Sequence, residues 1–214
     1  MFQMQRLKIT FNILLLLLII PSCGIFISSE VKNDFTFCYQ NENTGLDSLI
    51  NINGIYYINI NSVDREAIKH PYDTIYSAYK FFENGFFTIN PDTSVFSINV
   101  ETEKNSLFYH YYGKFGCYKL IGDTIKAQFL NPPGSITWDR AEIWFLIIND
   151  NTLKRIYRGD GKNVDINNFQ SKFKNNTCIL FPIENYPLDI KKTWLIKKKW
   201  FWCNKDDLKS YRKE

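Results

Sequence analysis

Two pairs of carboxylates have a spacing that could support acid–base chemistry. Asp64 and Glu66 are two positions apart, as are Glu101 and Glu103, so on a β-strand each pair lies on one face. General acid–base catalysis requires such groups to have perturbed pKa values in a cleft. Solvated strand faces explain the pattern more simply, and the sequence has no Gly-rich phosphate loop and no Gly-x-Ser-x-Gly elbow. We therefore expect a non-enzymatic protein, the alternative being an enzyme whose site is assembled from scattered positions.

The two histidines are the other candidate reactive side chains. His110 alternates with Phe108 and Tyr112, so the three share one face of a predicted strand. This face could line a ligand pocket, or His110 could simply be packed and hydrogen-bonded among aromatic neighbours. His70 precedes Pro71 in a predicted loop and lacks nearby metal ligands in the sequence. We retain Phe108, His110 and Tyr112 as a candidate pocket and expect no metal and no other cofactor.

The N-terminus has the layout of an export signal. Arg6 and Lys8 precede an unbroken apolar run over residues 13–20, which Pro21 ends. A membrane-spanning helix needs about 20 apolar residues, so this run is too short to span a bilayer and has the size of a signal-peptide core. The sequence Ile20-Pro21-Ser22-Cys23-Gly24 follows directly.

This pentapeptide resembles the lipobox of bacterial lipoproteins, in which an aliphatic and then a small residue precede a lipidated cysteine. The resemblance implies that residues 1–22 are a cleaved signal peptide and that Cys23 carries diacylglyceryl and palmitate. Two or more acyl chains give stable membrane anchoring. Gly24 after the cysteine and the lack of acidic residues over 24–29 imply the outer membrane, facing the periplasm. A secretory leader followed by an ordinary cysteine is the alternative.

Four further cysteines, Cys38, Cys117, Cys178 and Cys203, remain in the exported part. In an oxidising compartment they can form up to two disulfides, in any of three connectivities. No CxxC spacing occurs, so a zinc site is not expected. The alternative is a set of ordinary buried thiols.

The segment 191–202 combines three tryptophans with five lysines. Tryptophan favours membrane interfaces and lysine favours anionic headgroups, so Lys197, Lys198, Lys199 and Trp200 are a candidate contact for an anionic surface. The competing interpretation, which we favour, is a strand or helix with its aromatic face in the core and its lysines reaching solvent. In that case Trp194 is buried.

Hydrophobic alternation with frequent turn signals predicts a mainly β protein. Aromatic residues make up 17% of the chain, and such side chains fit pleated, half-buried surfaces. Asn84-Gly85 indicates a type I′ hairpin and Gly122-Asp123 another tight turn. We predict eight to ten strands, at residues 52–60, 74–82, 86–90, 94–100, 106–112, 113–121, 124–130, 142–148, 152–158 and 177–183. The run 142–148 fits a strand buried on both faces or a short helix. Residues 159–174 are expected to be a loop, and a short helix can follow residue 187.

The order of three segments, Asn53-Gly54-Ile55-Tyr56, then 116–126, then 145–153, resembles the lipocalin-like lipoproteins of Bacteroidetes. The resemblance covers most of residues 50–183, although Gly54-Ile55-Tyr56 stands where true lipocalins have Gly-x-Trp. It implies an antiparallel up-and-down meander that closes into a barrel and binds a small apolar ligand. The alternative is an interaction or immunity-type lipoprotein that acts through its outer surface.

The predicted organisation is a signal peptide (1–22), a lipidated cysteine with its tether (23–48), a β domain (49–186) and a basic aromatic C-terminal segment (187–214). The formal net charge is only +4, which is too small to indicate nucleic-acid binding. Expected partners are therefore the membrane, through the lipid anchor, and a small apolar ligand. We expect a monomer.

Overall fold

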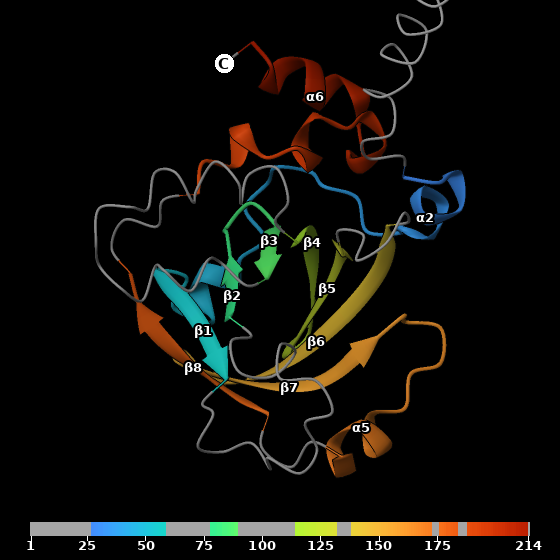
Figure 1. Cartoon of the computed structure of the whole chain (residues 1–214). Helices are drawn as coiled ribbons and strands as arrows, with labels where there is room; N and C mark the ends of the chain where they lie inside the picture. Colours follow the sequence, from blue (N-terminus) through green and yellow to red (C-terminus); the bar gives the residue numbers. More distant parts are fainter. Residues whose placement is uncertain are drawn as a thin grey trace, which may run out of the picture.

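The computed structural model describes residues 27–58, 78–89, 114–131, 138–172, 176–183 and 188–213. In this part of the chain eight strands form one closed antiparallel barrel in sequence order (Figure 1). The strands are β1 (Gly54–Ile58), β2 (Ala78–Phe81), β3 (Phe86–Ile89), β4 (Lys114–Ile121), β5 (Thr124–Asn131), β6 (Asp139–Asn149), β7 (Thr152–Gly159) and β8 (Thr177–Pro182). The predicted up-and-down barrel is confirmed. The predicted strands 94–100 and 106–112 lie outside the described residues.

The barrel closes because β8 pairs with β1 along its whole length. Tyr56 lies opposite Leu180, and the pairing runs from Gly54 with Pro182 to Ile58 with Cys178. Closure removes the exposed strand edges that an open sheet would present to other chains.

The hairpin between β2 and β3 forms where it was predicted, but the turn type is different. A type I′ turn needs positive φ at both Asn84 and Gly85. Only Gly85 has it, at 84°, and the amide of Phe82 donates to the carbonyl of Phe86. The loop therefore has three residues with glycine in the left-handed position, the next most common hairpin geometry.

Strand β6 is longer than predicted, and its inward face is more deeply buried than its outward face. Ile143 and Phe145 point into the barrel and are fully buried, whereas Trp144 and Leu146 point outward and are half-buried. The helical alternative for this run is wrong. The continuous apolar sequence reflects partial cover of the outer wall by neighbouring segments.

A second hydrophobic core lies outside the barrel. The chain before β1 and the chain after β8 pack together against the outer faces of β3, β4 and β5, where Phe86, Phe115 and Leu130 are fully buried. The first segment contains α2 (Ser29–Asp34). The second contains three 3₁₀ turns, Ile190–Lys192, Leu195–Lys197 and Lys199–Phe201, and helix α6 (Lys205–Tyr211). In Figure 1 this C-terminal segment, coloured orange to red, forms a separate layer over the barrel.

Helix α5 (Ile166–Lys172) lies in the stretch expected to be a loop. Asp165 caps it, because its carboxylate accepts a hydrogen bond of 3.0 Å from the amide of Asn168. Phe169 then packs against Tyr157 of β7, with ring centroids 6.3 Å apart. The polar sequence hides this helix because contacts of the Phe169 ring, and not an apolar stripe, attach it to the barrel.

Among the described residues, no helix is both long and apolar enough to cross a membrane.

Candidate functional site

Part of the barrel interior, where a ligand would bind, is filled by aromatic rings. Tyr79 and Phe81 of β2 reach Phe145 of β6 on the opposite wall, with ring centroids 4.8 and 5.5 Å apart. Phe87 and Phe129 complete the layer at 6.4 Å from each other. All five side chains are at most 1% exposed. Contact across the barrel means that side chains occupy this level of the interior.

One end of the barrel is closed by the chain that precedes β1. The 3₁₀ turn Leu46–Ser48 places Leu46 in the barrel core, and Ile50 follows it there. The hydroxyl of Tyr56 lies 2.7 Å from the carbonyl oxygen of Asp150 and 3.0 Å from that of Asn51. Burial raises the pKa of Tyr56, so its phenol stays protonated and can donate. Packed side chains therefore close this end of the barrel.

A charged group lies inside the barrel near β8. Arg155 of β7 is only 5% exposed, and its guanidinium donates to the side-chain oxygen of Asn176 at 2.7 and 3.2 Å and to the hydroxyl of Tyr79 at 3.1 Å. The ring of Phe169 from α5 covers it, 5.5 Å from Cζ. These contacts fix a planar array of donors against the aromatic layer, and such an array could hold the polar head of an apolar molecule.

Sequence reasoning did not single out Arg155 or Asn176. The signal was present, because Arg155 alternates with Leu153 and so belongs to the inward face of its strand. The predicted pocket residues Phe108, His110 and Tyr112 lie outside the described residues, as do His70, the two carboxylate pairs and Cys23.

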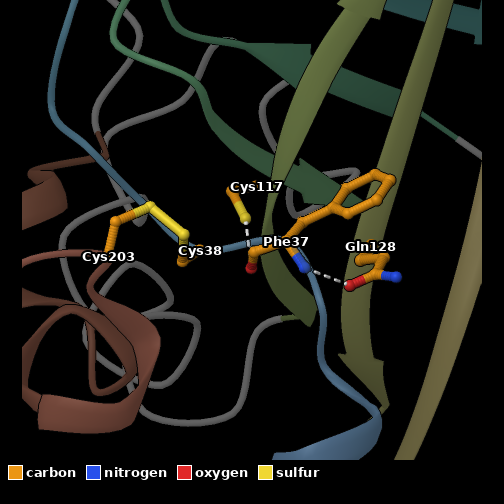
Figure 2. The surroundings of a disulfide bond; sticks show 5 residues. All are labelled: Phe37, Cys38, Cys117, Gln128 and Cys203. Atoms are coloured by element: carbon orange, nitrogen blue, oxygen red, sulfur yellow. Dashed lines mark hydrogen bonds between the residues drawn. A yellow bond between two sulfur atoms is a disulfide. The ribbon is translucent and has the colours of Figure 1, made fainter.

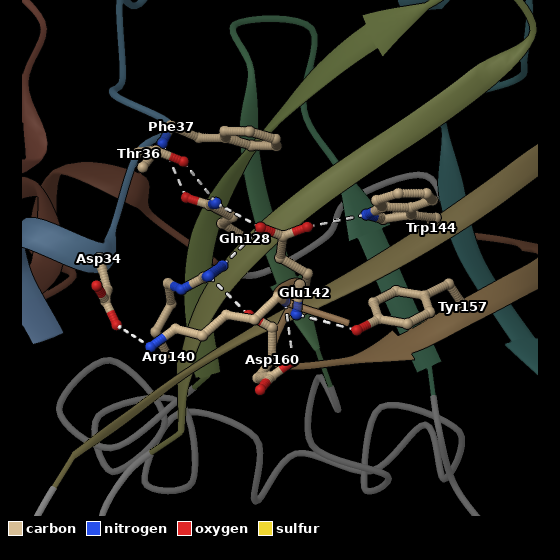
Figure 3. A network of polar contacts seen from close by, with 11 residues as sticks. Asp34, Thr36, Phe37, Gln128, Arg140, Glu142, Trp144, Tyr157 and Asp160 are labelled. Atoms are coloured by element: carbon tan, nitrogen blue, oxygen red, sulfur yellow. Dashed lines mark hydrogen bonds and ion pairs between the residues drawn. The ribbon is translucent and has the colours of Figure 1, made fainter. Parts of the chain in front are cut away.

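A polar network occupies the outer wall of β5 and β6 (Figure 3). Gln128 is fully buried there; its oxygen accepts from the amide of Phe37 at 2.8 Å and its nitrogen donates to Glu142 at 2.7 Å. The indole of Trp144 donates to the second carboxylate oxygen of Glu142 at 3.0 Å, and Arg140 forms an ion pair with the first. Both oxygens of Glu142 therefore have partners, and the network ties the N-terminal segment to the barrel wall.

The C-terminal segment has the buried aromatic face that we favoured. Trp194 is 7% exposed and packs against Trp138, with ring centroids 4.6 Å apart and ring planes tilted by 49°. Trp202 is 4% exposed, and its indole donates to the carbonyl of Ile196 at 2.8 Å. The predicted burial of Trp194 is confirmed. Trp200 is half-buried and lies in a 3₁₀ turn, so the strand-type spacing with Trp202 does not reflect a strand.

The lysines of this segment reach solvent. Lys197 and Lys199 are exposed, and Lys198 is half-exposed. Contact of these lysines and Trp200 with an anionic surface remains a prediction.

A single disulfide joins the two segments of the outer layer. Cys38 and Cys203 are bonded although 165 positions separate them (Figure 2). Cys117 and Cys178 are buried free thiols, and burial raises the pKa of each, that of Cys178 to about 12. The thiol of Cys117 lies 3.1 Å from the carbonyl oxygen of Phe37, next to the disulfide.

Within the described ranges, no group of three or more His, Cys, Asp or Glu side chains is placed to hold a metal ion. No protein-family model, no curated protein and no solved structure matches this chain.

Proposed function

We propose that this protein is a non-enzymatic bacterial cell-envelope lipoprotein whose barrel is a rigid scaffold acting through its outer surface. The lipobox-like sequence ending at Cys23 supports the anchor. The observation that carries the mode of action is the ring contact across the barrel, from Tyr79 to Phe145. A filled interior presents its outer wall, not a cavity, to a partner. The proposed location is the outer membrane, facing the periplasm, as a monomer.

The anchor is tested by replacing Cys23. Metabolic labelling with palmitate and cell fractionation of a Cys23→Ser variant should show no label and release from the membrane fraction, because position 23 then has no thiol to accept diacylglycerol. A Cys117→Ser variant is the matched control, since its thiol is buried in the barrel wall. A Cys23→Ser protein that is still labelled and still sediments with membranes would refute the anchor.

Binding of a small apolar ligand inside the barrel is the second candidate. It is favoured by Arg155, which places a guanidinium beside the aromatic layer. A titration of the lipid-free Cys23→Ser protein with the apolar fluorophore 1-N-phenylnaphthylamine distinguishes the two modes. The scaffold proposal expects no saturable increase in fluorescence. A saturable increase that Arg155→Leu changes, and that a surface variant such as Lys154→Gln does not, would establish the ligand site instead.

A further inference from the structure

We infer that the C-terminal layer, residues 188–213, is a docking surface for anionic lipid headgroups and holds the barrel in one orientation on the membrane. This inference rests on the lipid anchor proposed above. It goes beyond the four residues that the sequence singled out, because it assigns the whole layer, its rigidity and its position relative to the anchor.

Positive charge is concentrated in the C-terminal layer. Residues 188–213 contain nine basic and three acidic side chains, a net charge of +6, while the whole chain has only +4. The remainder of the chain is therefore at −2, so positive charge is concentrated in this layer. Such asymmetry attracts an anionic surface within a Debye length of about 8–10 Å.

The positive charge of the layer is exposed and only partly neutralised. The carboxylates of Asp189 and Asp206 each form an ion pair with one lysine of the layer, Lys192 at 3.5 Å and Lys209 at 2.7 Å. Lys197 and Lys199 form no ion pair with any carboxylate in the described part of the chain, and both are exposed. Both lysines are therefore accessible to an anionic partner.

The C-terminal layer is held in place by buried side chains and by a disulfide. This segment has little regular secondary structure, but its side chains Trp194, Leu195 and Phe201 are buried. The disulfide fixes it to the N-terminal segment, and Arg212 of the helix end donates to the carbonyl of Lys197 at 3.0 Å. A rigid layer presents its charges without the entropy cost of ordering a tail.

The proposed lipid anchor is close in sequence to a residue that packs with the C-terminal layer. Ile27, the first described residue, is 4% exposed and belongs to the same hydrophobic cluster as Trp194 and Leu208. Only residues 24–26 separate it from Cys23 in the sequence, so at most about 14 Å of extended chain can separate the Cα atoms of Cys23 and Ile27. In Figure 1, α2, which begins two residues after Ile27, lies beside the C-terminal layer. Acyl chains on Cys23 therefore bring this layer close to the headgroups.

The test separates docking from anchoring by using the lipid-free Cys23→Ser protein. We expect it to co-sediment with phosphatidylcholine vesicles that contain about 30 mol% phosphatidylglycerol, and not with vesicles of pure phosphatidylcholine. Each lysine at an anionic surface contributes about fivefold in binding, so Lys197→Gln with Lys199→Gln should weaken the partition coefficient about 25-fold. The matched control is Lys154→Gln with Lys162→Gln, which removes the same charge elsewhere and should change binding less than about twofold.

Unchanged thermal melting in both double variants would confirm that folding is not the cause. Equal binding to the two kinds of vesicle, or equal losses in the two double variants, would overturn the inference. Vesicle binding abolished by equimolar heparin would also overturn it, since the layer would then prefer a soluble polyanion. Palmitate labelling of the wild-type protein is unaffected by any of these outcomes, so a failure of the anchor is recognised separately.

Discussion

Reduction of the Cys38–Cys203 disulfide should destabilise the protein strongly, because the bond closes a very long loop. A cross-link between residues 165 positions apart removes about 17 cal/mol/K of chain entropy from the unfolded state, or about 5 kcal/mol at room temperature. This is an upper value, since residual structure in the unfolded chain reduces it, and losses of 2–5 kcal/mol are typical. The expected loss of unfolding free energy is therefore about 2–5 kcal/mol.

Urea denaturation followed by tryptophan fluorescence measures this loss, with the lipid-free Cys23→Ser protein as the background. Its midpoint should fall on addition of dithiothreitol, and a Cys38→Ser/Cys203→Ser variant should start at the lower midpoint and not respond to the reductant. Thiol titration of the denatured, oxidised protein should count the two free cysteines, Cys117 and Cys178. A midpoint that is the same with and without reductant, while the titration confirms a disulfide, would refute the entropic reasoning.

Three further changes test the packing and the buried hydroxyls. Trp194→Ala should lower the unfolding free energy by about 3–5 kcal/mol in the same assay, since it leaves a cavity beside Trp138. A loss below about 1 kcal/mol would contradict this expectation. Trp194→Phe should lower the unfolding free energy clearly less than Trp194→Ala, because it keeps an aromatic ring and removes a buried indole N–H that has no hydrogen-bond partner in the described structure. Equal losses of unfolding free energy in the two variants would argue against packing as the cause. Stability should fall as the pH rises above 10, because burial raises the pKa of Tyr56 and Tyr118 in the folded state while the unfolded phenols ionise near 10.0. Urea midpoints at pH 8 and pH 11 measure that slope, and Tyr56→Phe should reduce it.

The sequence determines the strand positions because alternation along a strand is a local property. Thr124 to Leu130 alternates cleanly and forms β5, and the glycines at 85 and 122 mark hairpins where a left-handed residue is required. The type of turn was harder to predict from the sequence. Asn84 could adopt positive φ, and only the pairing of Phe82 with Phe86 selects the three-residue loop.

The barrel itself was predictable because short turns between successive strands leave few other arrangements. What sequence reasoning missed depends on single contacts between distant segments. Helix α5 is attached through Phe169, which contacts Tyr157 and Arg155 of β7. Gln128, which donates to Glu142, is also held by Thr36 and Phe37 of a remote segment.

The sequence by itself predicted the described strands and the burial of the aromatic face that includes Trp194, because hydrophobic alternation is a local property. The export signal and the lipid-anchor motif inferred from it remain predictions. Tertiary structure alone decided which cysteines pair, because three connectivities are equivalent in sequence and only folding brings residues 38 and 203 together. It also decided that Arg155 meets Asn176 and Tyr79 inside the barrel, and that rings from opposite walls meet there. These features depend on distances across the barrel, and no local pattern along one strand contains that information.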